Sequence, residues 1–124
     1  MTIDYDGRCF RTVQNSRSGE VDSATIFRYR QRGPVVWAEY SGGQIVRGSL
    51  IATMRPDGVL DMRYHHLNAR GVLMTGICRS TPELLADGRI RLKEEWQWTC
   101  GERGTGCSVM EEFLPEDDSP AEIS

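Results

Sequence analysis

Apolar and polar residues alternate with a period of two along much of the chain. The clearest example is the segment RIRLKEEWQWTC, residues 89–100, in which one face would carry Ile90, Leu92, Glu94, Trp96, Trp98 and Cys100. The intervening residues are charged or polar: Arg89, Arg91, Lys93, Glu95, Gln97 and Thr99. A helix would scatter these tryptophans and charges around its circumference, whereas a strand places them on opposite faces. The segment therefore predicts a β-strand with one apolar face.

Turn-forming residues interrupt this pattern at regular intervals. Gly-Gly and Asp-Gly pairs supply the positive φ angles of tight hairpins, so most connections should join antiparallel neighbours. The stretches between the turns predict strands near residues 8–13, 24–32, 35–41, 44–55, 59–67, 72–80, 89–99 and 107–114. Residues 81–85 (TPELL) differ, because a threonine N-cap followed by proline predicts a short turn of helix.

Consecutive antiparallel strands with one apolar face must hide that face and their free edges. Closing the sheet does both. We therefore predict an all-β fold, an eight-stranded antiparallel up-and-down meander barrel of the lipocalin or streptavidin type. The alternative is a strongly curved open sheet or a sandwich, completed by dimerisation. Residues 1–114 would form this single domain, and the acidic residues 115–124 (PEDDSPAEIS) would form a disordered tail.

The composition narrows the range of partners. A formal charge of −3 and a pI near 5.4 lack the positive charge that phosphate backbones attract, so we expect no nucleic-acid partner. Residues 1–25 lack the apolar core of a secretory signal, and no apolar run is long enough to cross a bilayer. We therefore expect a cytoplasmic protein with no membrane partner.

The redox state of the four cysteines is expected to follow from that compartment. In a reducing environment, all four should be free thiols: Cys9, Cys78, Cys100 and Cys107. The alternative is a disulfide between Cys100 and Cys107, which could face each other across a hairpin.

Both histidines of the chain are adjacent, in the segment MRYHHLNARG, residues 62–71. Successive strand residues point to opposite faces, so His65 and His66 cannot enter one site unless a bulge intervenes. The alternation places His66 inside and His65 on the solvent face. Because no cysteines or histidines have the spacing of a tetrahedral zinc site, we expect no bound metal.

The predicted inner face carries polar and aromatic side chains among apolar ones. Its further members would be Leu60, Met62, Val72, Met74, Cys78 and Trp98. In the last strand, either Glu111 or Glu112 could face inward. A few polar groups in an otherwise apolar cavity are typical of a ligand pocket. The predicted ligand-binding residues are Tyr40, Tyr64, His66, Glu94, Trp96 and Glu111.

Three functions are compatible with such an interior. We favour a non-catalytic module that binds a small, partly apolar ligand without a cofactor. The first alternative is a structural or interaction protein with a filled core, forming a homodimer through an edge strand. The second is a small enzyme in which His66 and Glu94 or Glu111 form an acid–base pair tuned by burial.

Four longer motifs extend over more than half of the chain. They are Y-S-G-G-x-I-x-x-G from Tyr40 to Gly48, M-R-Y-H from Met62 to His65, L-M-T-G-x-C-x-S-T-P-E from Leu73 to Glu83, and E-x-W-Q-W-T from Glu94 to Thr99. Together they resemble a family of small bacterial proteins that often bear the name N-acetylglutamate synthase. The resemblance implies a uniform small all-β family.

Acetyltransferase activity is not expected from this resemblance. True N-acetylglutamate synthases resemble acetyl-coenzyme A-dependent acetyltransferases, which need a mixed α/β fold and a glycine-rich loop that opens a helix. The sequence predicts neither feature. The resemblance therefore carries over no catalytic residue.

Overall fold

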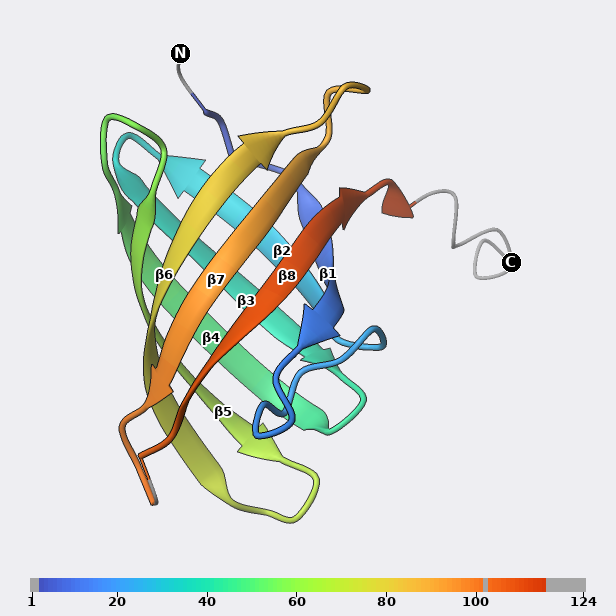
Figure 1. Cartoon of the computed structure of the whole chain (residues 1–124), viewed down its shortest axis with the longest axis vertical. Coiled ribbons are helices and arrows are strands. Elements are labelled where there is room, and N and C mark those ends of the chain that lie inside the picture. The colour runs from blue at the N-terminus through green and yellow to red at the C-terminus, as the bar shows by residue number, and fades with distance from the viewer. Residues whose placement is uncertain (1–2, 102, 116–124) are drawn as a thin grey trace.

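The strands form one closed antiparallel barrel (Figure 1). The computed structural model describes residues 3–101 and 103–115. Within these ranges the strands are β1 (Cys9–Asn15), β2 (Ile26–Arg32), β3 (Val35–Gly42), β4 (Ile45–Met54), β5 (Leu60–Asn68), β6 (Leu73–Leu84), β7 (Ile90–Trp98) and β8 (Thr105–Phe113). Each strand pairs with its neighbours in sequence, and β1 pairs with β8. The prediction of an eight-stranded up-and-down barrel is confirmed.

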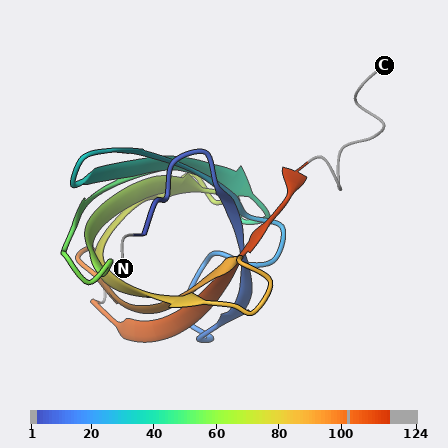
Figure 2. The same cartoon turned by 90° about the horizontal axis from the view of Figure 1, so that it is seen from above.

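Closure of the ring is visible along the barrel axis in Figure 2. The alternative of an open sheet or a sandwich is wrong, because pairing of β1 with β8 leaves neither strand with a free edge. Addition of a partner's strand to β1 or β8 is therefore excluded as the basis of a homodimer. The predicted disordered tail falls almost entirely on residues 116–124, which lie outside the described residues.

The period-two pattern determines which side chains fill the barrel. In β7, Ile90, Leu92, Glu94, Trp96 and Trp98 are buried, and the residues between them are half-buried or exposed. The same alternation holds in β3, where Val36, Ala38 and Tyr40 are buried. The sequence pattern of this strand allows either alternating set, Val36, Ala38 and Tyr40 or Val35, Trp37 and Glu39, to face inward. The structure agrees with the favoured set, which places Tyr40 inside.

The predicted helical turn at residues 81–85 is wrong. Residues up to Leu84 continue β6 and pair with β7, with Pro82 opposite Leu92. Beyond Ser80 this strand has no partner in β5, so a residue without an N–H is tolerated at this sheet edge. No helix within the described ranges has the length and apolar character needed to span a bilayer.

The inward placement of Val72 is also wrong. Its side chain lies in the turn between β5 and β6 and is 43% exposed. β6 begins only at Leu73, so the strand alternation that we extended to Val72 does not yet apply there. Met74, the next predicted inner residue, is partly buried against the core.

The two ends of the barrel are closed in different ways. The N-terminal segment crosses the upper end in Figure 1, where Ile3 and Tyr5 are buried. The Tyr5 hydroxyl donates a hydrogen bond to the Gly58 carbonyl at 2.7 Å. The lower end carries the turns β3–β4, β5–β6 and β7–β8 together with the β1–β2 loop, residues 16–25. The candidate site lies toward this lower end.

Candidate functional site

A small cavity of about 50 Å³ lies inside the barrel beneath the β1–β2 loop. It is lined by Asn15, Gly19, Glu20, Val21, Phe27, Tyr40, Leu50, Met62, Tyr64, His66, Cys78, Glu94, Trp96, Trp98 and Ser108. Five of the predicted site residues are among them: Tyr40, Tyr64, His66, Glu94 and Trp96. Since one water needs roughly 10–15 Å³ of such space, the cavity has room for about three to five water molecules.

Three of the cavity's aromatic rings lie over glycines in the neighbouring strand. The register pairs Tyr40 with Gly48, Tyr64 with Gly76, and Trp96 with Gly106. A Cβ atom added at any of these glycines would overlap the ring of its partner. The missing side chains thus let each ring approach the backbone of the neighbouring strand closely. The sequence places aromatic residues and glycines in register to build the walls of the site.

His66 connects the barrel wall to the β1–β2 loop through both of its ring nitrogens. Nδ1 lies 2.9 Å from the Tyr40 hydroxyl, and Nε2 lies 2.8 Å from Oε1 of Glu20. Burial raises the pKa of Tyr40, so its hydroxyl keeps the proton that it donates to Nδ1. Nε2–H then donates to the Glu20 carboxylate. Burial also lowers the pKa of His66, which favours this neutral imidazole, while the hydrogen bond to Glu20 opposes that shift.

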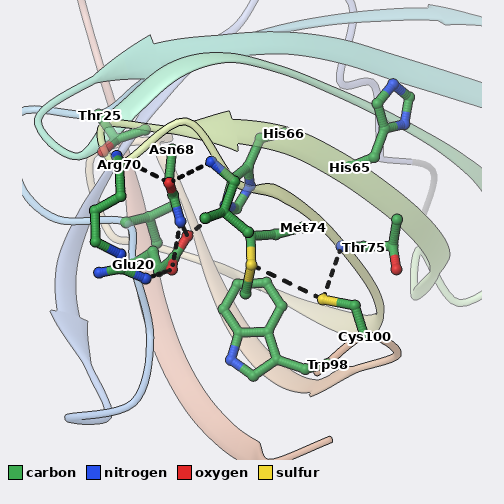
Figure 3. Close-up of polar contacts among 12 residues, drawn as sticks. Glu20, Thr25, His65, His66, Asn68, Arg70, Met74, Thr75, Trp98 and Cys100 are labelled. Carbon is green, nitrogen blue, oxygen red and sulfur yellow. Dashed lines mark hydrogen bonds and ion pairs between the residues drawn. The ribbon is translucent and has the colours of Figure 1, made fainter. Parts of the chain in front are cut away.

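Glu20 reaches from the loop into a group of donors on β5 and the following turn (Figure 3). Besides His66, the Asn68 amide Nδ2 lies 3.1 Å from Oε2 of Glu20, and the Arg70 guanidinium lies 3.5 Å from the same oxygen. The Glu20 side chain is only 13% exposed. A loop carboxylate therefore closes this side of the cavity.

The floor of the cavity is a carboxyl group. Glu94 on β7 is buried and receives hydrogen bonds from the hydroxyls of Ser80, at 2.6 Å, and Ser108, at 3.1 Å. Burial raises the pKa of Glu94, and these two hydrogen bonds partly offset the rise. No basic side chain in the described ranges forms an ion pair with Glu94. The floor can therefore offer a ligand either a buried acceptor or a carboxylic acid donor.

The predicted acid–base pair of His66 and Glu94 is not assembled. Both groups line the same cavity, but each forms its hydrogen bonds with other residues.

Glu111 is placed outside the site, which corrects the prediction for the last strand. Its carboxylate lies 2.9 Å from Nε of Arg91 on the outer face of β7. Glu112 is the residue that faces inward, but at the opposite end of the barrel, where it pairs with Arg8 at 2.7 Å. The alternation of β8 determines this outcome, because Ser108 and Met110 share the inner face with Glu112.

The β1–β2 loop contributes contacts that sequence analysis missed. The Trp98 indole N–H donates to the Ser18 carbonyl at 3.3 Å. Asn15, the last residue of β1, adds a second missed contact, because its Oδ1 accepts a hydrogen bond from the Trp96 indole N–H at 3.2 Å. A polar loop has no periodic signal that could have identified Glu20. Asn68 could have been found, because it continues the inward alternation of Tyr64 and His66 by one step.

His65 points away from the site, as predicted. Its side chain is exposed, and Figure 3 shows it directed away from Glu20. Within the described ranges, no group of three or more His, Cys, Asp or Glu side chains could hold a metal ion. All four cysteines are free, so the disulfide alternative between Cys100 and Cys107 is not formed.

Comparison with known proteins assigns the chain to a family. No curated protein and no solved structure matches it. The model of one family, described as "Avidin-like protein", matches residues 3–113, which include every strand of the barrel. This match does not concern the N-acetylglutamate synthase name, which stays untested. The closed eight-stranded barrel agrees with the match. The chain belongs to the avidin-like family.

Proposed function

We propose that this protein binds a small, partly apolar molecule in the cavity beneath the β1–β2 loop. The observation that carries the proposal is one cavity with aromatic walls, a buried carboxyl at its floor and a charged residue at its mouth. Such a combination of apolar walls and few polar groups is typical of small-molecule sites. The avidin-like family binds small molecules such as biotin, which supports the same function. The cytoplasmic location stays a prediction from the sequence.

Ligand entry would require the β1–β2 loop to move. A cavity of about 50 Å³ is far below the roughly 300–1,000 Å³ of typical ligand pockets. Gly19, Glu20 and Val21 of the loop are part of its lining. The loop contains no strand, and polar contacts such as those from Glu20 and Asn15 hold it. Its displacement would enlarge the cavity without disturbing the strand pairing.

Tryptophan fluorescence provides the test. Trp96 and Trp98 line the cavity, whereas Trp37 is 39% exposed on the outer face of β3. A Trp37→Phe variant would therefore report only on the site. We expect biotin, or another member of a panel of small acids, amides and heterocycles, to change its emission saturably and to raise its Tm.

A matched variant shows where such a ligand binds. Ser108→Phe would fill space at the floor and should abolish the response, provided that circular dichroism shows an intact barrel. Thr53→Phe, on the outer face of β4, should retain the response. Unchanged emission and Tm across the whole panel would contradict the proposed function.

A second candidate function is self-association through the outer face of β3 and β4. Trp37 and Ile51 are direct neighbours in register, and both are exposed. Val35 extends this apolar surface along β3. Exposed apolar patches of this kind often mark protein interfaces. The contact would bring two barrel walls together, in place of the edge-strand contact that the closed barrel excludes.

The mass in solution tests this second candidate. We expect the protein to sediment as an oligomer and Ile51→Glu to convert it to a monomer. Leu73→Glu, a matched change at an exposed leucine outside this surface, should leave the mass unchanged. A monomeric wild-type protein at high concentration would contradict the candidate.

A further inference from the structure

The Glu20 carboxylate is bound by a set of hydrogen-bond donors, and contacts that do not involve Glu20 hold these donors in place. His66 Nε2, Asn68 Nδ2 and the Arg70 guanidinium converge on its two oxygens at 2.8, 3.1 and 3.5 Å. We call these three side chains the cradle. His66 and Asn68 are almost fully buried, whereas the Arg70 side chain is 71% exposed. The cradle thus combines two fixed donors with a solvent-facing cation, which suits a single carboxylate.

The donors of the cradle are oriented by contacts on the barrel side. Oδ1 of Asn68 accepts hydrogen bonds from the backbone N–H groups of Arg70 and Val72, both at 3.0 Å, so Nδ2 is directed toward Glu20. The Tyr40 hydroxyl fixes the His66 ring in the same way. These groups belong to paired strands and one tight turn. The cradle should therefore keep its geometry when the β1–β2 loop moves.

The cradle is also continuous with the apolar cavity. His66 lines the cavity and contacts the rings of Tyr64 and Trp98, with ring centroids 6.4 and 5.7 Å away. One molecule could therefore place an acidic group on the cradle and an apolar group against these rings. A buried carboxylate without such donors would carry a large desolvation cost.

We propose that the cradle is a carboxylate-binding subsite of the pocket, and that Glu20 is its built-in competitor. An acidic ligand would bind by displacing the Glu20 carboxylate from His66 and Asn68, which also releases the loop. This inference deepens the proposed function and rests on it for the apolar part of the ligand. Because Glu20 is tethered, its effective concentration at the cradle is on the order of millimolar or higher, and a free carboxylate must outcompete it.

Chemical rescue of a Glu20 variant tests the subsite. Glu20→Ala removes the Cγ methylene and the carboxylate, which are two of the three carbons of propanoate, so added propanoate can return a carboxylate to the cradle. We expect propanoate to bind Glu20→Ala saturably, to raise its Tm and to restore the Trp98 indole N–H signal in NMR spectra. Propanamide, its uncharged counterpart, should have no effect at equal concentration. The wild-type protein should bind propanoate at least about tenfold more weakly, because Glu20 competes.

Longer carboxylates probe the connection to the cavity. Each further methylene that enters the apolar cavity should tighten binding to Glu20→Ala by about fourfold, from butanoate to hexanoate. If affinity does not increase along this series, the carboxylate sits outside the cavity and the proposed continuity is wrong.

An isosteric variant separates binding from general stability. Asn68→Asp keeps Oδ1, which the turn requires, but replaces the Nδ2 donor with a carboxylate oxygen. In the Glu20→Ala background it should abolish propanoate binding while circular dichroism remains unchanged. Glu39→Ala, which removes the same charge from the outer face of β3, should behave as wild type toward propanoate. If Glu20→Ala is poorly folded, Glu20→Gln provides the same comparison, with intermediate affinity expected.

The outcomes distinguish this inference from the proposed function. Equal binding of propanoate and propanamide to Glu20→Ala, or no binding of either, would overturn the subsite even if the wild-type protein binds a neutral ligand. Selective rescue by propanoate would support the subsite even if no panel compound perturbs Trp96 and Trp98 in the wild-type protein.

Discussion

Nε2 of His66 lies 2.8 Å from Oε1 of Glu20, although 46 positions separate the two residues in the chain. The contact joins a strand of the barrel wall to a loop that belongs to no strand. It therefore determines where the β1–β2 loop rests on the barrel. The adjacent His65 is exposed and takes no part. The two histidines thus form a natural pair of test and control positions.

Replacing His66 should destabilise the protein much more than replacing His65. His66→Ala removes two hydrogen bonds and leaves a cavity beside Tyr40 and Glu20, so we expect a loss of about 2–4 kcal/mol. His65→Ala removes an exposed side chain and should change stability by less than about 0.5 kcal/mol. Urea denaturation measures both free energies of unfolding. Equal losses in the two variants would show that the His66 contacts contribute little.

Glu94 should make the protein less stable as the pH rises. Burial raises its pKa above the ordinary value of 4.5, so the folded protein retains this proton to a higher pH than the unfolded chain does. The stabilisation from this group is complete below pH 4.5 and is lost as the pH rises through the folded pKa. Glu94→Gln lacks the titrating group. It should therefore gain stability relative to wild type as the pH rises above 4.5.

The contribution of His66 to stability has the opposite pH dependence to that of Glu94. It cancels when wild type is compared with Glu94→Gln. The lowered pKa of His66 makes stability fall as the pH drops below the ordinary value of 6.5. This contribution is present in both wild type and Glu94→Gln, so the difference between the two unfolding free energies isolates Glu94. A difference that is independent of pH would contradict a raised pKa at Glu94.

The glycines beneath the aromatic rings should not tolerate a side chain. A methyl group at Gly76 would overlap the Tyr64 ring, so Gly76→Ala should cost about 1–3 kcal/mol. The cost should largely disappear in a Tyr64→Ala background, where the ring is absent. A double-mutant cycle measured by urea denaturation quantifies this coupling. Additive losses would show that strand propensity alone, and not the ring, determines the requirement for glycine.

The four thiols should react with a thiol reagent at different rates. Cys107 is exposed and should be modified first, followed by the half-buried Cys100. Cys9 and Cys78 are buried, and burial raises the pKa of Cys78, so both should react only when the barrel unfolds. Counting modified thiols by mass spectrometry over time checks the order. A Cys107→Ser variant should lose only the fastest step.

The sequence predicted the barrel because the signals that specify strands and hairpins are local. Alternation in residues such as those of β7, together with turn residues at regular spacing, specifies strands and hairpins without reference to distant parts of the chain. The same alternation placed Tyr40, Tyr64, His66, Glu94 and Trp96 on the inner face, where they line one cavity. The alternation failed at Val72, where the strand had not yet begun. A different signal, the threonine and proline that favoured a helical turn at residues 81–85, failed because these residues pair with β7.

The sequence by itself thus determined the strands, their faces and the order in which they pair. Only the tertiary structure decided that Glu111 lies outside with Arg91 and that Glu20 enters the barrel, whose predicted closure is completed by pairing of β1 with β8. The reason is physical. A strand's faces follow from the geometry of each residue and its neighbours. The position of a loop carboxylate depends on donors on distant strands, which meet only when the ring has closed.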